Sequence, residues 1–118
     1  MKKNWVDRMF AAIDCKDTET FVNFLAPSCI FRFGNMAPVE GKENIKNVTI
    51  EFLASIKAIS HTLIEVWDIP DGKVCHGQVE YTRKDDSILL IPFADVLKGK
   101  EGSITQYLIF GDTSELYK

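Results

Sequence analysis

The chain has 118 residues, of which 46% are hydrophobic and 26% are charged, with a formal net charge of -3. This length is enough for one compact domain and too short for two, and the apolar share excludes a disordered chain. The slight acidity gives no electrostatic reason to expect nucleic acid as a partner. No apolar run is long enough to span a membrane. We therefore predict a single domain over residues 1–118 that binds neither nucleic acid nor a membrane.

The basic pair and the cysteines indicate where the protein works. Lys2-Lys3 is not followed by the apolar core of a signal peptide, which predicts a cytoplasmic protein. Cys15, Cys29 and Cys75 are odd in number and widely spaced, which favours reduced thiols over a disulfide framework. The sequence also lacks metal-ligand spacing and a phosphate-binding glycine loop, so we predict no metal and no cofactor.

The first half of the chain predicts three amphipathic helices. Apolar residues recur there at helical spacing, and Asn4 and Asp17 or Thr18 are plausible N-caps. The predicted helices cover residues 4–15, then 17 or 18 to about 26, and 42 or 43 to 60. The segment Cys29–Phe33, C-I-F-R-F, separates the second from the third and is typical of a strand.

The second half of the chain predicts four strands. The first three strands run over residues 61–69, 73–83 and 87–97, and the fourth follows the turn at 98–102 and ends at Phe110. Pro70-Asp71-Gly72 forms the turn between the first two strands. Helices grouped ahead of an antiparallel meander indicate an α+β fold with the helices on one face of the sheet.

The strand Ser87–Leu97 is apolar on both of its faces. The helices can cover only one face of an antiparallel sheet, so we expect a second subunit to cover the other, in a homodimer through the sheet. Pro92 removes one backbone donor from this strand and predicts a bulge there.

Asp95 is the most informative residue, because it is a lone carboxylate late in this apolar strand. An unpaired buried carboxylate is costly, so such a group is paired, hydrogen-bonded or neutral. It is either a structural acid, satisfied by Arg32, a backbone amide or the dimer partner, or an acid in a pocket that donates or accepts a proton.

Two further residues are candidate catalytic groups. Arg32 occupies the strand face opposite Phe31 and Phe33 and would hold a carboxylate or enolate if that face is turned inward. If it is turned outward, Arg32 is only a surface charge. His61 opens a strand with a mixed face, and a histidine near a cleft can act as acid or base at neutral pH. His76 lies on a mostly polar face, where solvent exposure is the default.

Several aromatic residues are candidate walls of a binding pocket, although each could equally belong to the core. Phe93 shares the strand face of Asp95. The predicted substrate-binding residues are these aromatic side chains and one methionine: Tyr107, Trp67, Phe52, Phe93, Tyr81 and Met9.

This order of elements resembles the nuclear transport factor 2-like superfamily, which includes ketosteroid isomerases, SnoaL-like polyketide cyclases, scytalone dehydratases and limonene-epoxide hydrolases. The resemblance rests on V-D-R-M-F-A-A-I-D at residues 6–14, F-L-A-P at 24–27 entering I-F-R-F, V-E-G-K-E-N-I at 39–45 and D-V-L-K-G-K-E-G-S-I at 95–104. It implies a cone-shaped α+β barrel, with three N-terminal helices packed on a curved, mostly antiparallel sheet around an apolar pocket.

The resemblance also implies roles for single residues. Asp95 matches the acid of the ketosteroid isomerase oxyanion hole. The isomerase tyrosine falls at Met9, which cannot donate a hydrogen bond, and the hydroxyl of Tyr107 would replace it only if it points inward. The base falls at Arg32, which cannot accept a proton at neutral pH. The resemblance therefore argues against steroid isomerisation. The overall pattern is more similar to SnoaL-like proteins than to ketosteroid isomerases.

Two functions remain open from the sequence. One is a cofactor-free isomerase, cyclase or dehydratase that moves a proton on a small apolar or cyclic carbonyl compound, with Asp95 and Arg32 in the pocket. The other is a non-catalytic dimeric module that binds a small apolar ligand or a protein partner.

Overall fold

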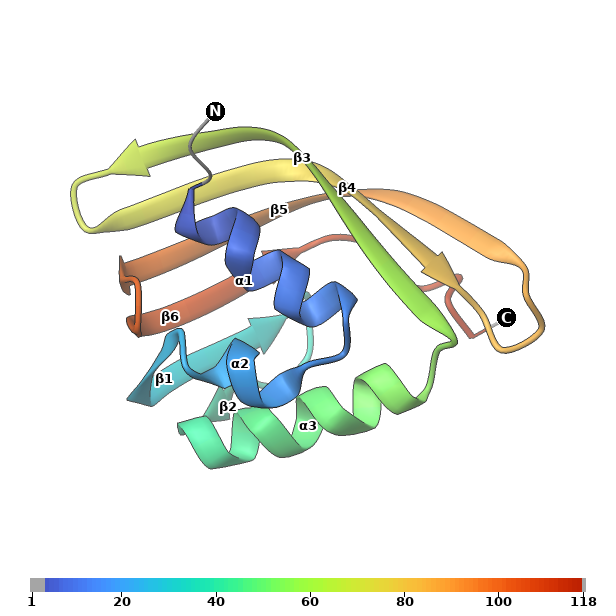
Figure 1. Ribbon diagram of the computed structural model, residues 1–118, viewed down its shortest axis with the longest axis horizontal. Helices are drawn as coiled ribbons and strands as arrows, with labels where there is room; N and C mark the ends of the chain where they lie inside the picture. Colours follow the sequence, from blue (N-terminus) through green and yellow to red (C-terminus); the bar gives the residue numbers. More distant parts are fainter. Residues whose placement is uncertain (1–3, 118) are drawn as a thin grey trace.

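The computed structural model describes residues 4–117 and has an α+β fold, as the sequence predicts. Three helices and six strands follow one another along the chain (Figure 1). The helices are α1 (Trp5–Asp14), α2 (Thr18–Val22) and α3 (Lys42–Ala54). The strands are β1 (Leu25–Phe33), β2 (Val39–Glu40), β3 (Ala58–Ile69), β4 (Gly72–Thr82), β5 (Ile88–Lys100) and β6 (Ser103–Phe110).

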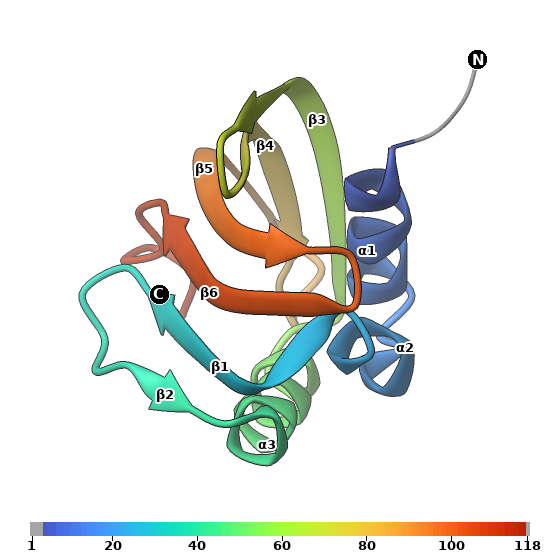
Figure 2. The same ribbon diagram turned by 90° about the vertical axis from the view of Figure 1, so that its left-hand side faces the viewer.

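The six strands form one sheet in the order β2-β1-β6-β5-β4-β3. All neighbouring strands are antiparallel except β1 and β6, which are parallel. The sheet is strongly curved, and Figure 2 shows its two halves bent toward the helices. Helix α1 packs beside β3, and α3 packs against β1 and β2. The helices therefore lie on the inner side of a curved sheet.

The local sequence explains where the first two helices begin. The Asn4 side chain accepts a hydrogen bond from the Val6 N–H at 3.0 Å, and the Asp7 carboxylate accepts one from the Asn4 N–H at 3.2 Å, which together form a capping box. Asp17 caps α2 by accepting a hydrogen bond from the Thr20 N–H at 3.2 Å.

Some predicted boundaries are wrong. Helix α2 ends at Val22, and β1 begins at Leu25 and runs through Pro27 with a register shift before Ile30. Helix α3 ends at Ala54, so β3 begins earlier than predicted. The third helix also follows β1 and β2, so the three helices do not form one N-terminal group.

Pro92 does not cause the predicted bulge. It pairs with Gln78 in an unbroken β4–β5 register, and the pairing of β5 with β6 reaches only to Ala94, opposite Phe110. At Pro92 no strand pairs with β5 on the side away from β4, so a missing N–H costs the sheet no hydrogen bond on that side. The sheet's bulges lie elsewhere, including one in β3 between Leu63 and Glu65.

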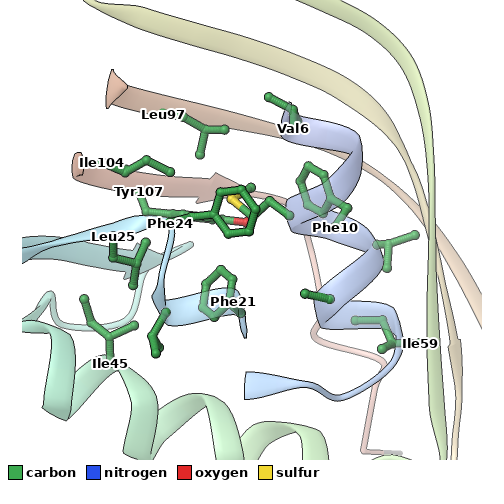
Figure 3. Close-up of a cluster of buried hydrophobic side chains, with 14 of the residues drawn as sticks. Val6, Phe10, Phe21, Phe24, Leu25, Ile45, Ile59, Leu97, Ile104 and Tyr107 are labelled. Carbon is green, nitrogen blue, oxygen red and sulfur yellow. The ribbon is translucent and has the colours of Figure 1, made fainter. Parts of the chain in front are cut away.

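The main core fills the space between the helices and the inner face of the sheet. Figure 3 shows side chains from α1, α2 and strands β1, β5 and β6 converging there. The rings of Phe21 and Tyr107 meet edge to face, with centroids 5.8 Å apart. Among the helices of residues 4–117, none is long and apolar enough to cross a membrane.

Candidate functional site

An apolar cavity of about 160 Å3 lies between the inner face of the sheet and helix α3. Each of the three helices and six strands contributes to its walls, α3 most among the helices, and most of the lining side chains are aliphatic or aromatic. Met36, which is 67% exposed, and Ala37 also line it, so the cavity opens toward solvent beside the loop that joins β1 to β2. A small molecule could enter there and reach the sheet.

Asp95 lines this cavity and is only 2% exposed. Alternation along β5 turns Phe93, Asp95 and Leu97 inward, and the flanking strands β4 and β6 bury their backbone. Burial raises the pKa of the Asp95 carboxyl to about 8, and a hydrogen bond with Tyr107 lowers it in part. One oxygen, Oδ1, has no hydrogen-bond partner among the described residues. Asp95 is therefore mostly protonated at neutral pH and can donate a hydrogen bond.

Tyr107 lies beside Asp95 in the cavity wall and is 1% exposed. Burial and the neighbouring Asp95 carboxyl raise the pKa of its hydroxyl well above the ordinary value. The ring packs against Phe31, with centroids 5.3 Å apart. Tyr107 is thus a fixed, neutral group next to the acid.

His61 also lines the cavity, and its side chain is 10% exposed. Its ring contacts Phe10 and Phe93 at centroid distances of 4.5 Å and 5.3 Å. The Nδ1 atom lies 2.6 Å from Asp14 Oδ1, and the His61 backbone N–H donates to Asp14 Oδ2 at 2.9 Å. Asp14 therefore holds the imidazole ring in place and leaves Nε2 as the ring nitrogen available to a ligand.

Asp14 is a functional candidate that the sequence analysis missed, since it is 47 residues from His61 in the chain. It is the last residue of α1, where a carboxylate opposes the helix dipole. That unfavourable position was a signal in the sequence that the acid has a partner outside its helix.

The predicted wall residues fall into two groups. Phe52, Phe93, Tyr81 and Tyr107 line the cavity. The rings of Phe52 and Tyr81 meet edge to face at 6.1 Å, and burial raises the pKa of the Tyr81 hydroxyl. Trp67 and Met9 do not line the cavity.

Trp67 is 48% exposed on the outer face of the sheet. Regular alternation would put Trp67 on the same face as His61, but the bulge between Leu63 and Glu65 inserts one residue and reverses the alternation in the rest of β3. Val66 packs against the core in its place. Met9 is fully buried, but in the core under α1 rather than in the cavity wall.

Arg32 is exposed, and its Nε–H donates to the backbone oxygen of Met36 at 3.1 Å. Its neighbours in β1, Phe31 and Phe33, line the cavity, so alternation turns Arg32 to the opposite face. The hypothesis that Arg32 is a cation in the pocket or the partner of Asp95 is therefore wrong.

Thr49 of α3 is a second candidate that the sequence analysis missed. It lines the cavity, and its Oγ1 atom is buried without a hydrogen-bond partner among residues 4–117. Within the same range, no group of three or more histidine, cysteine, aspartate or glutamate side chains could hold a metal ion.

The fold and cavity together define a class: an α+β domain in which helices and a curved sheet enclose a small apolar site with a buried acid. The model of the SnoaL-like domain matches residues 6–107, and the chain belongs to this family. The match and the related structures also confirm the nuclear transport factor 2-like superfamily. No curated protein is similar to the chain in sequence.

Several solved structures have the same fold at low sequence identity. One is a protein from Catenulispora acidiphila with a ketosteroid isomerase-like fold, in complex with trimethylamine (TM-score 0.86, 16% identity, 98% of this chain and 91% of that one). Another is TerC co-crystallised with polyporic acid (TM-score 0.81, 16% identity, 95% and 92%). A third is an LEH-like epoxide hydrolase from M. tuberculosis (TM-score 0.79, 10% identity, 95% and 83%).

Proposed function

We propose that this protein binds a small, mostly apolar carbonyl compound in its cavity and catalyses a proton transfer at the carbon next to the carbonyl, without a cofactor. Such a step is common to isomerases, cyclases and some dehydratases. The observation that carries the proposal is the placement of a buried, protonated acid and a carboxylate-held histidine in one apolar cavity. Two titratable groups in unlike environments are what an acid–base pair needs.

Each group has a defined part in the proposed reaction. Asp95, protonated at neutral pH, donates a hydrogen bond to the substrate carbonyl and stabilises the negative charge that develops on its oxygen. His61 Nε2 removes the proton from the adjacent carbon and returns it to another atom of the same molecule. The substrate is neither oxidised nor reduced, and the protons balance within it. Tyr107 fixes the Asp95 carboxyl.

The cavity limits the size of the compound. About 160 Å3 is close to the roughly 150 Å3 of an engineered apolar cavity that holds benzene. A single ring or a short chain fits, and a four-ring steroid skeleton does not. The structural relative from C. acidiphila was solved with trimethylamine, which also supports a small ligand for this chain.

Hydrogen–deuterium exchange tests this function without knowledge of the natural substrate. We expect the protein to catalyse exchange at the carbons next to the carbonyl of cyclohexanone in D2O, followed by proton NMR. His61→Gln should lower the rate by about 10²- to 10⁴-fold, because it removes the base. Asp95→Ala should lower it by about 10²- to 10³-fold, because it removes the donor to the enolate oxygen.

Arg32→Gln is the matched control, because Arg32 lies on the outer face and should not affect exchange. Equal exchange in the wild type, His61→Gln and Asp95→Ala would contradict the catalytic proposal. Binding of cyclohexanone without any exchange would favour the alternative function, a non-catalytic ligand-binding module.

We also propose that a second copy of the chain covers the outer face of the sheet. A row of cross-strand neighbours there is apolar, with Val74, Val96 and Leu108 paired in register across β4, β5 and β6. Leu90 and Phe110 on the same face are 55% and 56% exposed. Apolar surface of this kind on a central strand supports an interface between subunits.

Phe110→Glu should therefore convert the homodimer to a monomer, because it places a charge in the apolar interface. Sedimentation velocity at micromolar concentration measures the change. Ile50→Glu is the control, since Ile50 is 46% exposed on α3, away from the outer face, and should leave the dimer intact. A wild-type protein that sediments as a monomer would contradict the proposed dimer.

A further inference from the structure

Two buried side-chain oxygens in the described part of the chain have no hydrogen-bond partner, and both belong to residues that line the cavity. They are Asp95 Oδ1 on the sheet and Thr49 Oγ1 on helix α3. Buried polar atoms are nearly always satisfied, so each exception needs an explanation. The common location of these two atoms indicates one explanation for both, a polar ligand in the cavity.

The hydroxyl of Thr49 could have been satisfied within its own helix. A threonine in a helix commonly donates to the backbone carbonyl of the residue four positions earlier, which here is Ile45. Thr49 Oγ1 has no such bond and stays unpaired. A valine has nearly the same shape and would fill this position without burying an unpaired hydroxyl. The hydroxyl is therefore a cost to the fold that a ligand contact would offset.

We infer that Thr49 determines substrate specificity by hydrogen bonding a second oxygen of the ligand, while Asp95 binds the first. This inference rests on the proposed function and narrows its substrate class to small hydroxy-ketones or diketones. The two contacts come from opposite elements, α3 and β5, so they would hold the ligand across the width of the cavity. The limited volume means that one ring or a short chain separates the two oxygens.

The test compares one-oxygen and two-oxygen probes on matched variants. Dissociation constants for cyclohexanone, 3-hydroxycyclohexanone and 4-hydroxycyclohexanone are measured by NMR titration. The wild type should bind one of the hydroxy-ketones about tenfold more tightly than cyclohexanone, as expected for one buried hydrogen bond. Thr49→Val should abolish this preference, so that it binds the hydroxy-ketones no more tightly than cyclohexanone. Thr49→Ser, which retains the hydroxyl, should keep most of the preference.

The thermal midpoint of each variant checks that the fold is intact, and Thr49→Val should unfold at a temperature no lower than the wild type. Equal preference in the wild type and Thr49→Val would overturn the inference, and so would the lack of any preference in the wild type. If cyclohexanone binding still weakens in Asp95→Ala in either of those cases, the proposed function stands without the Thr49 contact. If no probe binds, the proposed function and the inference fall together.

Discussion

The free energy of unfolding should fall as the pH rises from about 4 to about 8, and Asp95→Asn should remove most of that fall. The pKa of the Asp95 carboxyl is raised by burial to about 8 in the folded protein, against an ordinary value of 3.8. Between these values the folded chain keeps a proton that the unfolded chain has released. Raising the pH therefore favours unfolding, and the dependence ends above pH 8.

The effect of this one carboxyl is large, on the order of 5 kcal/mol across the interval. Exposed acids such as Asp17 and Asp85, whose pKa values are lowered by hydrogen bonds, act in the opposite direction but are present in both proteins. The difference between wild type and variant thus isolates Asp95. Urea unfolding at pH 4, 5, 6, 7 and 8 measures it, and parallel pH profiles of the two proteins would contradict a protonated buried acid.

Asp14→Asn should lower the rate of hydrogen–deuterium exchange by about 10²- to 10⁴-fold, although Asp14 does not line the cavity. The His61 backbone N–H can only donate, so the amide oxygen of the variant would turn toward it. The amide NH2 then faces Nδ1 and makes that nitrogen an acceptor. The ring proton moves to Nε2, which can no longer act as the base.

Nitrogen NMR of the His61 ring follows this change of tautomer directly, and a merely structural role for Asp14 would not produce it. Asp17→Asn is the control, because Asp17 also accepts a backbone hydrogen bond but lies in an exposed cap of α2. An Asp14→Asn protein with the wild-type tautomer and the wild-type exchange rate would show that His61 does not depend on Asp14.

Alternation along a regular strand made part of the site predictable from the sequence. In β5 no bulge interrupts the run from Phe93 to Leu97, so counting by twos correctly placed Phe93 and Asp95 on the same face of the strand. The same rule gave opposite faces to Arg32 and Phe31, but not which of them was inner. The packing of β1 against α3 determines which of these two side chains points inward. Local sequence patterns do not predict that packing.

Other parts of the site depended on features that the sequence does not display. One extra residue in β3 turned Trp67 outward, and nothing near Ile64 marks the bulge. Asp14 reaches His61 only because α1 packs along β3. Thr49 looked like an ordinary helical residue, and its missing partner is visible only in three dimensions.

The most direct test of this account is an NMR titration of the Asp95 side-chain carboxyl in the wild-type protein. The proposed function depends on this group being held protonated at neutral pH in an apolar cavity, where it can donate a hydrogen bond to a ligand. It predicts a midpoint near 8 that shifts when cyclohexanone is added. A midpoint close to the ordinary value of 3.8, unchanged by the ligand, would contradict it.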